Sequence, residues 1–476
     1  MSTPVLTEDC IFEIFDHLRN DRSTLHKSLF VNRLFCRNIV PILYKKPFRN
    51  VKDHLHYYLL INTYLTCLNE GERSFLIQNN IKIEEESTTT LFEYGMYLEG
   101  LPYSNLNINL EFWFLYQFYD MNKNQKYIQY QDYNKFYCDI HDDTRYKLIR
   151  NTLFHSFFRQ FKFINPKYLK VRNNIFDTNL YDSQFFKEIT SNLKNLSSLH
   201  IYIDDQMKDF VSDFLILLSE NCFNLIDFKV STTINIEHES TLPCLLSRLI
   251  KQQKNLVSFY LRINNQNNEV YNIFELLQSQ KNTLTTLQLD GCHFDERSID
   301  LLTRFERLES LNLTCCDGID LNICKRISND KIKLKKLKLR NNYWEPNMTA
   351  TFISSIGSSL TSLVHQEVSF PLNVNEEVYK SIITTCKNLD KFEAWIDSEV
   401  VLSYLANNLP NDLRAFTLKF YGGATPVYLE YFFINFNYVT LLQEMNFDFV
   451  MSDKCLEIIL KYVGRMKLDQ GFWSLD

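Results

Sequence analysis

The chain has 476 residues, of which 45% are hydrophobic and 23% charged, and its formal net charge is -6. This composition indicates a folded protein, and the length suggests about three units or one elongated repeat array. The negative net charge does not indicate the basic surface that nucleic-acid-binding proteins have. No stretch reaches the roughly 18 apolar residues of a membrane span, and no signal peptide is evident. We therefore expect no nucleic-acid or membrane partner and a location in the cytoplasm, the nucleus or both.

Two amphipathic helices with a third behind them are expected near the N-terminus. In the first, Ile11, Ile14, Phe15 and Leu18 recur at the spacing of one helical face, after Thr7. The second is expected from about residue 23 to Ile39, ending at Pro41. Such a small unit exposes more apolar surface than it can bury alone, which indicates a partner.

The order of residues in this stretch resembles the F-box family. The matching positions are Leu6, Ile14-Phe15, Leu18, Val31-Asn32-Arg33, Phe35 and Pro41-Ile42-Leu43-Tyr44. Thr7 replaces the family's Pro, Phe35 and Tyr44 replace Trp, and the charged loop from Arg19 to Arg22 is inserted. The alternative is an ordinary helical hairpin that caps a larger fold.

Residues 49–165 are expected to form a mostly helical linker region, with a polar insertion near 121–143. His54–Leu68 has helical spacing and is expected to break at Gly71. Asn109–Tyr119 is strongly aromatic and fits a buried helix or strand, and a further helix is expected from Thr144 to about Phe161. His141, Asp142 and Asp143 could together bind a metal ion, but three such adjacent residues more often form a solvated turn.

The 12 cysteines are scattered without a Cys-x-x-Cys pair, so we expect reduced thiols that mostly serve as packing residues. We also find no Gly-rich phosphate loop, no nucleophile elbow and no zinc-ligand spacing. The sequence therefore predicts no catalytic residues, no metal and no cofactor.

A Leu-x-x-Leu-x-Leu pattern, with apolar replacements, recurs ten times at periods of 24 to 31 residues. The copies are Leu196/Leu199/Ile201, Leu225/Phe228/Val230, Leu256/Phe259/Leu261, Leu284/Leu287/Leu289, Leu308/Leu311/Leu313, Leu334/Leu337/Leu339, Leu360/Leu363/His365, Leu389/Phe392/Ala394, Leu413/Phe416/Leu418 and Leu442/Met445/Phe447. An earlier degenerate copy at Tyr168–Val171 is a candidate capping repeat, which gives about ten or eleven repeats over 166–476.

This pattern resembles the leucine-rich-repeat family. Each copy reads as a short strand with one buried face, followed by an apolar helical stretch, and such units must stack to bury their apolar faces. The expected fold is α/β: a small N-terminal helical F-box (1–48), the helical linker region, and a curved solenoid with a parallel sheet on its concave face and helices outside. Turn positions where the family has Asn or Cys are held by Asn264, Cys292, Cys316 and Asn342. His365 takes an apolar position, and we expect it to be a satisfied core residue.

Polar strand residues between the apolar positions are expected to line the concave face. One repeat contributes three basic residues, and an Arg-and-aromatic lining is typical of protein-binding surfaces. The predicted target-binding residues are Tyr202, Tyr260, Arg262, Lys336, Lys338, Arg340, Glu393, Trp395 and Lys419.

An F-box followed by leucine-rich repeats resembles the substrate-recognition subunit of an SCF-type cullin-RING ubiquitin ligase. That resemblance implies a non-catalytic protein that docks a Skp-family adaptor and presents a target protein for ubiquitin-dependent degradation. The implied adaptor contacts, some of which must instead fill the core, are Leu6, Ile11, Ile14, Phe15, Leu18, Leu25, Val31, Phe35, Leu43 and Tyr44. The alternatives are a repeat scaffold without a ligase, and a regulator of a small GTPase that uses an arginine such as Arg340.

Overall fold

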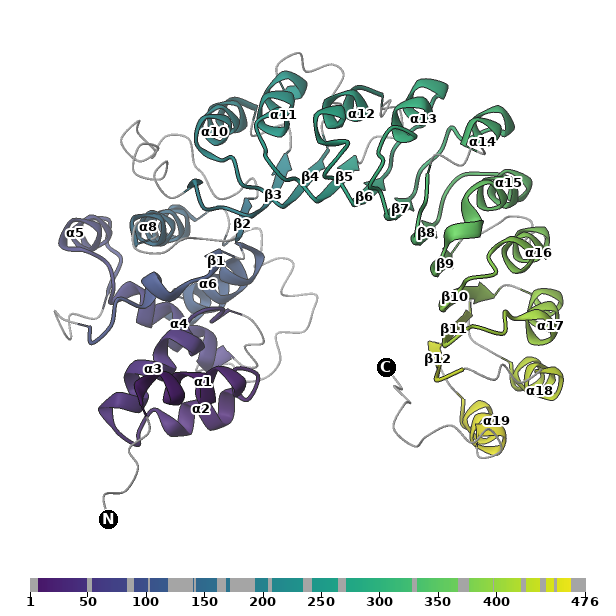
Figure 1. The fold of residues 1–476 in the computed structure, drawn as a ribbon. Helices are drawn as coiled ribbons and strands as arrows, with labels where there is room; N and C mark the ends of the chain where they lie inside the picture. Colours follow the sequence, from purple (N-terminus) through teal and green to yellow (C-terminus); the bar gives the residue numbers. More distant parts are fainter. Residues whose placement is uncertain are drawn as a thin grey trace. The chain divides into compact units, whose positions relative to one another are not determined.

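The fold is described from a computed structural model in which the chain forms two compact units, Met1–Leu225 and Ile226–Asp476 (Figure 1). Each unit is described by itself. The predicted domain boundaries after residues 48 and 165 remain predictions. The described residues are 7–48, 54–83, 90–101, 103–118, 140, 143–160, 168–171, 193–203, 208–233, 242–263, 271–327, 332–366, 376–396, 398–420, 425–436, 442–448 and 452–463.

Three short helices open the first unit. Helix α1 spans Glu8–His17 and is capped by Thr7, whose hydroxyl accepts a hydrogen bond from the Cys10 amide at 3.4 Å. Helices α2 (Arg22–Ser28) and α3 (Arg33–Leu43) follow.

The prediction of one helix from residue 23 to Ile39 is wrong. Asn32 is extended, and its side chain accepts a hydrogen bond from the Phe35 amide at 2.8 Å, so it starts a new helix. Pro41 lies inside α3 rather than ending it.

The three helices share a small apolar core. Ile11 and Phe15 of α1, Leu25 of α2, and Ile39 and Leu43 of α3 are buried in it. The Phe15 and Phe35 rings meet edge to face at a centroid distance of 4.9 Å. This core accounts for the helical periodicity of the sequence.

The rest of the first unit, in its described residues, consists of helices and three strands. Its elements are α4 (His54–Leu65), α5 (Glu70–Gln78), η1 (Tyr94–Tyr97), β1 (Gly100–Leu101), α6 (Tyr103–Phe118), α8 (Thr144–Gln160), β2 (Tyr168–Val171), β3 (Ser198–Ile203) and α10 (Lys208–Asn221). The strands pair in parallel in the order β1-β2-β3.

Helix α8 confirms the helix predicted from Thr144, and α6 shows that the aromatic stretch from Asn109 is helical. The expected break at Gly71 is wrong, because Gly71 lies inside α5. The chain leaves the helical path earlier, and Asn69 forms a reciprocal capping box with Glu72. Most of the predicted polar insertion near 121–143, including His141 and Asp142, lies outside the described residues.

The second unit repeats a strand and a helix along the chain. Its elements are β4 (Asp227–Thr232), α11 (Leu242–Lys251), β5 (Ser258–Ile263), α12 (Tyr271–Leu277), η7 (Gln278–Gln280), β6 (Thr286–Asp290), α13 (Glu296–Leu302), β7 (Ser310–Thr314), α14 (Leu321–Ile327), β8 (Lys336–Arg340), α15 (Pro346–Ile356), η8 (Gly357–Ser359), β9 (Ser362–Gln366), α16 (Glu376–Thr385), β10 (Lys391–Ile396), α17 (Glu399–Asn408), β11 (Ala415–Phe420), α18 (Pro426–Asn435), β12 (Glu444–Asp448) and α19 (Asp453–Val463).

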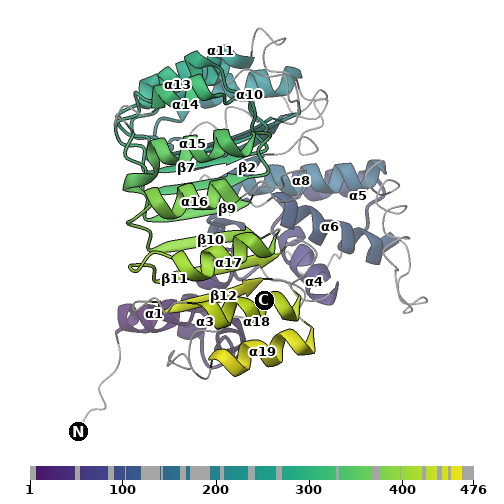
Figure 2. The ribbon, with the colours of Figure 1, turned by 90° about the vertical axis from the view of Figure 1, so that its right-hand side faces the viewer.

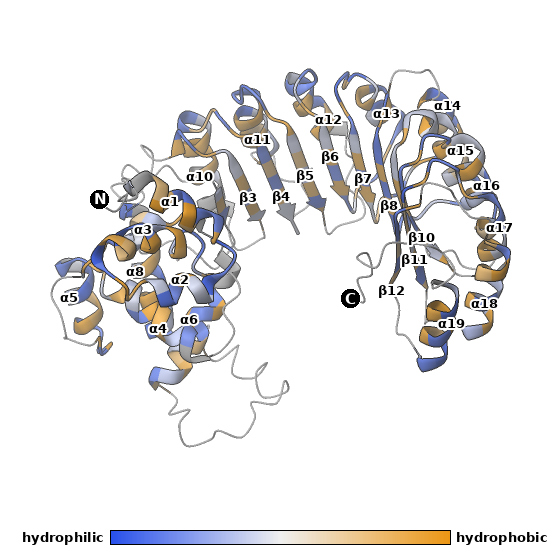
Figure 3. Cartoon of the chain, turned by 60° about the horizontal axis from the view of Figure 1, so that its bottom comes forward, coloured by the Kyte–Doolittle hydropathy of each residue, from blue (hydrophilic) through white to orange (hydrophobic). Residues whose placement is uncertain are grey.

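These strands form a parallel sheet in sequence order, in which equivalent repeat positions stand side by side. Leu287, Leu311 and Leu337 are register partners in β6, β7 and β8. The strands follow the inner side of an arc, and the helices lie on its outer side (Figures 1 and 2). Figure 3 shows polar and apolar residues alternating along β4 to β7. The second unit is thus a curved leucine-rich-repeat solenoid, as the sequence predicts.

The turns after β6, β7 and β8 explain why Cys or Asn recurs two residues after each strand, at Cys292, Cys316 and Asn342. Gly291, Cys315 and Asn341 occupy one equivalent position and all have positive φ. The next residue then points inward: the Asn342 side chain accepts from the Cys316 amide at 2.9 Å and donates to the Leu313 carbonyl at 3.2 Å. The predicted structural role of Cys316 and Asn342 is confirmed, and both are buried. Asn264 lies outside the described residues.

His365 is the core residue that the sequence predicts. It is buried in β9, and its Nδ1 lies 3.2 Å from the Tyr379 hydroxyl, which donates to the Trp395 carbonyl at 2.7 Å. Strand β9 still pairs with both neighbours, so the departure from the repeat pattern does not interrupt the sheet. Among the described residues, no helix is long and apolar enough to cross a membrane.

Candidate functional site

The first candidate surface consists of exposed apolar residues on α1, on the turn between α2 and α3, and in the first turn of α3. The set, called here the N-terminal apolar set, is Phe12 (42% exposed), Ile14 (49%), Phe30 (88%), Val31 (62%) and Leu34 (38%). Figure 3 shows the apolar stretch on α1. Large apolar side chains left in water within so short a stretch mark an interaction site more often than a chance exposure.

The structure divides the ten residues predicted to contact an adaptor. Ile14 and Val31 are exposed. The buried members are Ile11, Phe15, Leu25 and Leu43, and the members partly buried against the same core are Leu18, Phe35 and Tyr44. Leu6 lies outside the described residues. Sequence periodicity marks both groups as apolar, but only the packed helices show which side chains reach the surface.

Tyr44 packs within the first unit rather than standing at its surface. Its ring lies 4.4 Å from that of Tyr94 in η1 and 6.2 Å from that of Tyr64 in α4. Burial raises the pKa of the Tyr44 hydroxyl, so it stays protonated. This aromatic contact ties the end of α3 to the helices that follow.

Three exposed members of the set, Phe12, Phe30 and Leu34, were not among the predicted contacts. Phe30 and Val31 lie in the turn between the end of α2 at Ser28 and Asn32, the N-cap of α3, and both are exposed. The signal that could have located the turn is Asn32 itself, a favoured N-cap residue inside an apolar run.

The second candidate surface is the helix-free face of the repeat sheet. On β5 and β6, the Tyr260 hydroxyl donates to Asp290 at 3.3 Å, and the Arg262 Nε lies 3.4 Å from the same carboxylate. Burial raises the pKa of Asp290, against the lowering effect of Arg262. Burial and the neighbouring Asp290 raise the pKa of Tyr260 to about 12. The group presents an arginine and a tyrosine held in place by one carboxylate.

A second group, called here the Trp395 cluster, lies on β8, β10 and β11. The Glu393 carboxylate lies 3.4 Å from Lys419 Nζ and 3.8 Å from Arg340 Nη2, and it accepts a hydrogen bond from Trp395 Nε1 at 3.3 Å. Lys419 Nζ lies 5.4 Å from the centre of the Trp395 ring, within cation–π range. The Arg340–Glu393 pair spans β9, where Val364 is only 7% exposed.

The remaining predicted residues differ in exposure. Lys336 and Lys338 are exposed on β8, and within the described part of the chain neither has a carboxylate partner in an ion pair. Tyr202 is half-buried on β3 of the first unit. The three basic residues of β8 therefore differ: Lys336 and Lys338 are exposed, whereas Arg340 forms an ion pair with Glu393. The sequence did not predict this ion pair.

Several ionisable groups on the sheet pair with one another, among them Glu393 with Lys419 and Asp290 with Arg262. Burial raises the pKa of the Cys222 and Cys386 thiols to about 12, which disfavours nucleophilic thiolates. None of the eleven cysteines in the described ranges forms a disulfide bond. Within those ranges, no three His, Cys, Asp or Glu side chains are placed to hold a metal ion.

Comparison with known proteins adds two distant structural likenesses. No protein-family model matches the chain, and neither does any curated protein sequence. The leucine-rich repeat-containing protein LegL7 from Legionella pneumophila matches with 14% identity and a TM-score of 0.36, over 58% of this chain and 82% of its own. The Rad7 and Elc1 complex in yeast matches with 16% identity and a TM-score of 0.32, over 56% of this chain and 75% of the matched chain. The repeat fold is established by the strands and helices of the second unit.

Proposed function

We propose that this protein is the substrate-recognition subunit of an SCF-type cullin-RING ubiquitin ligase. In this proposal α1–α3 form an F-box that docks a Skp-family adaptor, and the open face of the repeat sheet holds a target protein. One observation carries the proposal: Ile14 and Val31, two residues at positions that resemble the F-box pattern, stand exposed while other matching residues build the core.

The exposed apolar set supplies a driving force for docking. Fully burying an Ile, Val or Phe side chain contributes about 1.5–3 kcal/mol relative to leaving it in water. Burial of Ile14, Phe30 and Val31 against a partner would therefore change the affinity by several orders of magnitude. Exposed residues of this kind are the anchors expected at an interface centre.

The sheet supports the other half of the proposal. Trp395, Arg340 and Arg262 are of the residue types that dominate protein interfaces, and each is held by a neighbouring carboxylate, which limits the entropy lost on binding. The protein contributes no chemical group in this mechanism. It acts by tethering a target near a ubiquitin-charged enzyme and so raising the effective concentration of the target's lysines. We place this activity in the cytoplasm or the nucleus.

Co-purification with a Skp-family adaptor tests the docking step. The variant Ile14→Asp/Val31→Asp replaces two exposed residues and spares the buried Phe15. It should lose the adaptor while keeping the circular dichroism and Tm of the natural chain. The matched control is Val427→Asp/Ile434→Asp, which makes the same change at residues 69% and 64% exposed on α18, and it should retain the adaptor.

A natural chain that does not bind the adaptor, or a double variant that binds it equally well, would contradict the proposal and leave a repeat scaffold without a ligase role. Target binding is tested separately by affinity capture with cullin and proteasome activity blocked. Proteins captured by the natural chain but lost from Lys338→Glu/Arg340→Glu, while the adaptor is retained, are the candidate targets.

A further inference from the structure

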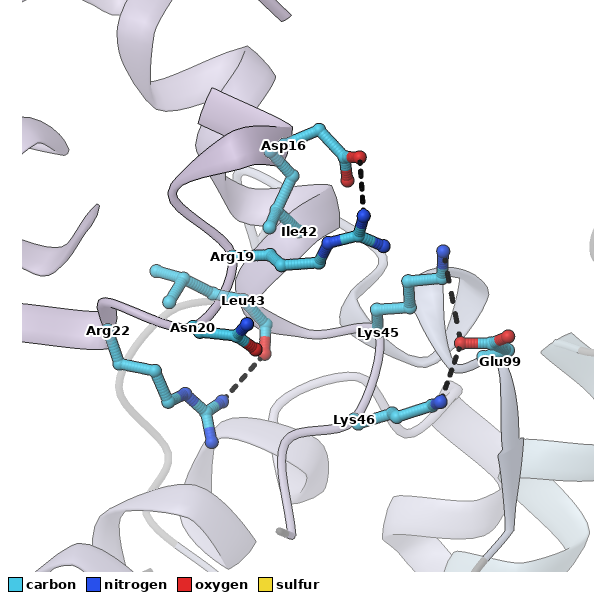
Figure 4. Close-up of a pocket in the computed structure, with 9 residues that line it drawn as sticks. All are labelled: Asp16, Arg19, Asn20, Arg22, Ile42, Leu43, Lys45, Lys46 and Glu99. Carbon is cyan, nitrogen blue, oxygen red and sulfur yellow. Dashed lines mark hydrogen bonds and ion pairs between the residues drawn. The ribbon is translucent and has the colours of Figure 1, made fainter. Parts of the chain in front are cut away.

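The first unit also contains a pocket with a charged lining. A pocket of about 570 Å³ opens between the α1–α2 connection, the end of α3 and Glu99 (Figure 4). Its charged lining comprises Arg19, Arg22, Lys45 and Lys46 against Asp16 and Glu99, which leaves two positive charges in excess. The whole chain carries a net charge of -6, so this local excess does not reflect a basic protein.

The cations of this pocket are only loosely matched by its carboxylates. One oxygen of Glu99 serves both lysines, at 3.8 Å from Lys45 and 3.3 Å from Lys46, and Arg19 lies 3.7 Å from Asp16. By comparison, Lys335 and Glu309 on the repeat unit approach to 2.7 Å. The lysine ammonium groups therefore keep donor capacity for a further anion.

The frame of the pocket is fixed by hydrogen bonds. Arg22 donates to the Leu43 carbonyl at 2.8 Å, which joins the start of α2 to the end of α3. The Glu99 amide donates to the Lys45 carbonyl at 2.9 Å, which joins the opposite wall to the same segment. Figure 4 shows the bond from Arg22 to the Leu43 carbonyl and the Glu99 carboxylate between Lys45 and Lys46. The cations are thus carried on walls that are already in place before a ligand arrives.

We propose that this pocket binds a small molecule that carries several phosphate groups. The volume is that of a small-molecule site, and charge-assisted hydrogen bonds from arginine and lysine are the recognition that phosphate oxygens favour. Among the described residues that line it, only Ile42 and Leu43 offer apolar contacts, which favours a compact polyanion over an apolar ligand. Its occupant would link α1, α2 and α3 to the Glu99 segment and so stabilise the first unit.

Calorimetric titration of the full chain with sodium tripolyphosphate at low ionic strength tests the proposal. The natural chain should bind, and its Tm should rise with ligand concentration. Lys45→Glu/Lys46→Glu should weaken binding by about a hundredfold, since each of the two lost contacts to a charged group is worth about a factor of ten. Glu99→Gln removes the internal competitor and should tighten binding by about two- to fivefold.

The control variant Lys254→Glu/Lys281→Glu makes the same charge change at exposed lysines of the repeat unit and should leave binding unchanged. Absence of binding by the natural chain overturns the proposal. Equal losses in the two double variants would also overturn it, because they would show diffuse attraction rather than a site. Binding of an oligoglutamate peptide, in place of tripolyphosphate and through the same two lysines, would assign the pocket to an acidic protein segment instead.

Discussion

Substitution of Asn342 by Ala tests the physical basis of the repeat stack. The Asn342 side chain is buried beside the turn after β8 and reaches into the preceding repeat. It accepts from the Cys316 amide at 2.9 Å and donates to the Leu313 carbonyl at 3.2 Å. Alanine keeps the backbone position but leaves both buried groups without this partner.

The cost follows from the two bonds. A buried backbone group that loses its hydrogen bond pays a desolvation penalty of about 1–3 kcal/mol. Cys316 loses the bond to its amide outright, whereas a carbonyl such as that of Leu313 tolerates partial satisfaction more easily. We therefore expect Asn342→Ala to lower the free energy of unfolding by about 2–4 kcal/mol.

Urea denaturation followed by circular dichroism measures this loss, with Asn408→Ala as the control. Asn408 is exposed on α17, and within the described part of the chain its side chain bonds only to the Tyr404 carbonyl of its own helix, so its loss should stay within about 0.5 kcal/mol. If Asn342→Ala costs no more than Asn408→Ala, the side chain does not hold neighbouring repeats together and the reasoning fails.

Three further predictions concern other parts of the fold. Burial would raise the pKa of Glu72, but hydrogen bonds from His155 and Arg159 lower this pKa overall. The ionised carboxylate therefore stabilises the fold above its ordinary pKa of 4.5, and this stabilisation is lost as the pH falls below that value. The unfolding free energies of Glu72→Gln and the natural chain should differ more at pH 7 than at pH 3. Gly291→Ala should cost about 1–3 kcal/mol in urea denaturation, because Gly291 has φ of 72° and an added Cβ would meet the Ile263 carbonyl, and a neutral result would refute that clash. Trp395→Ala should reduce capture of target proteins without loss of the adaptor, and unchanged capture would remove the Trp395 cluster from the target-binding surface.

The repeat unit was largely predictable because its signal is periodic. Most strands bury alternate residues, and equivalent apolar positions recur in register, so the sequence marks the strands β4 to β12 directly. Strand β1 has two residues and was not predicted, since a pair of residues carries no period. The positive φ of Cys315 and Asn341 was not predicted either, because this conformation is uncommon for residues other than glycine and their presence in a sequence does not indicate it.

The candidate surfaces were less predictable because they depend on packing between elements. Ile14 and Phe15 are adjacent and equally apolar, yet Ile14 is exposed and Phe15 buried, which follows only from where α3 lies against α1. Similarly, Arg340 and Glu393 are more than fifty residues apart, and their pairing across β9 depends on the curvature and register of the sheet. Sequence gives the residue types of such a surface, whereas the fold decides which of them are open to a partner.

The central claim is that α1 and the α2–α3 turn are the adaptor-docking surface. Hydrogen–deuterium exchange, read by mass spectrometry with and without a saturating Skp-family adaptor, tests it without any substitution. We predict slower exchange in peptides that cover α1 and residues 29–35, and no change in α17 to α19. Unchanged exchange in the first two regions, or protection confined to the repeat unit, would contradict the claim.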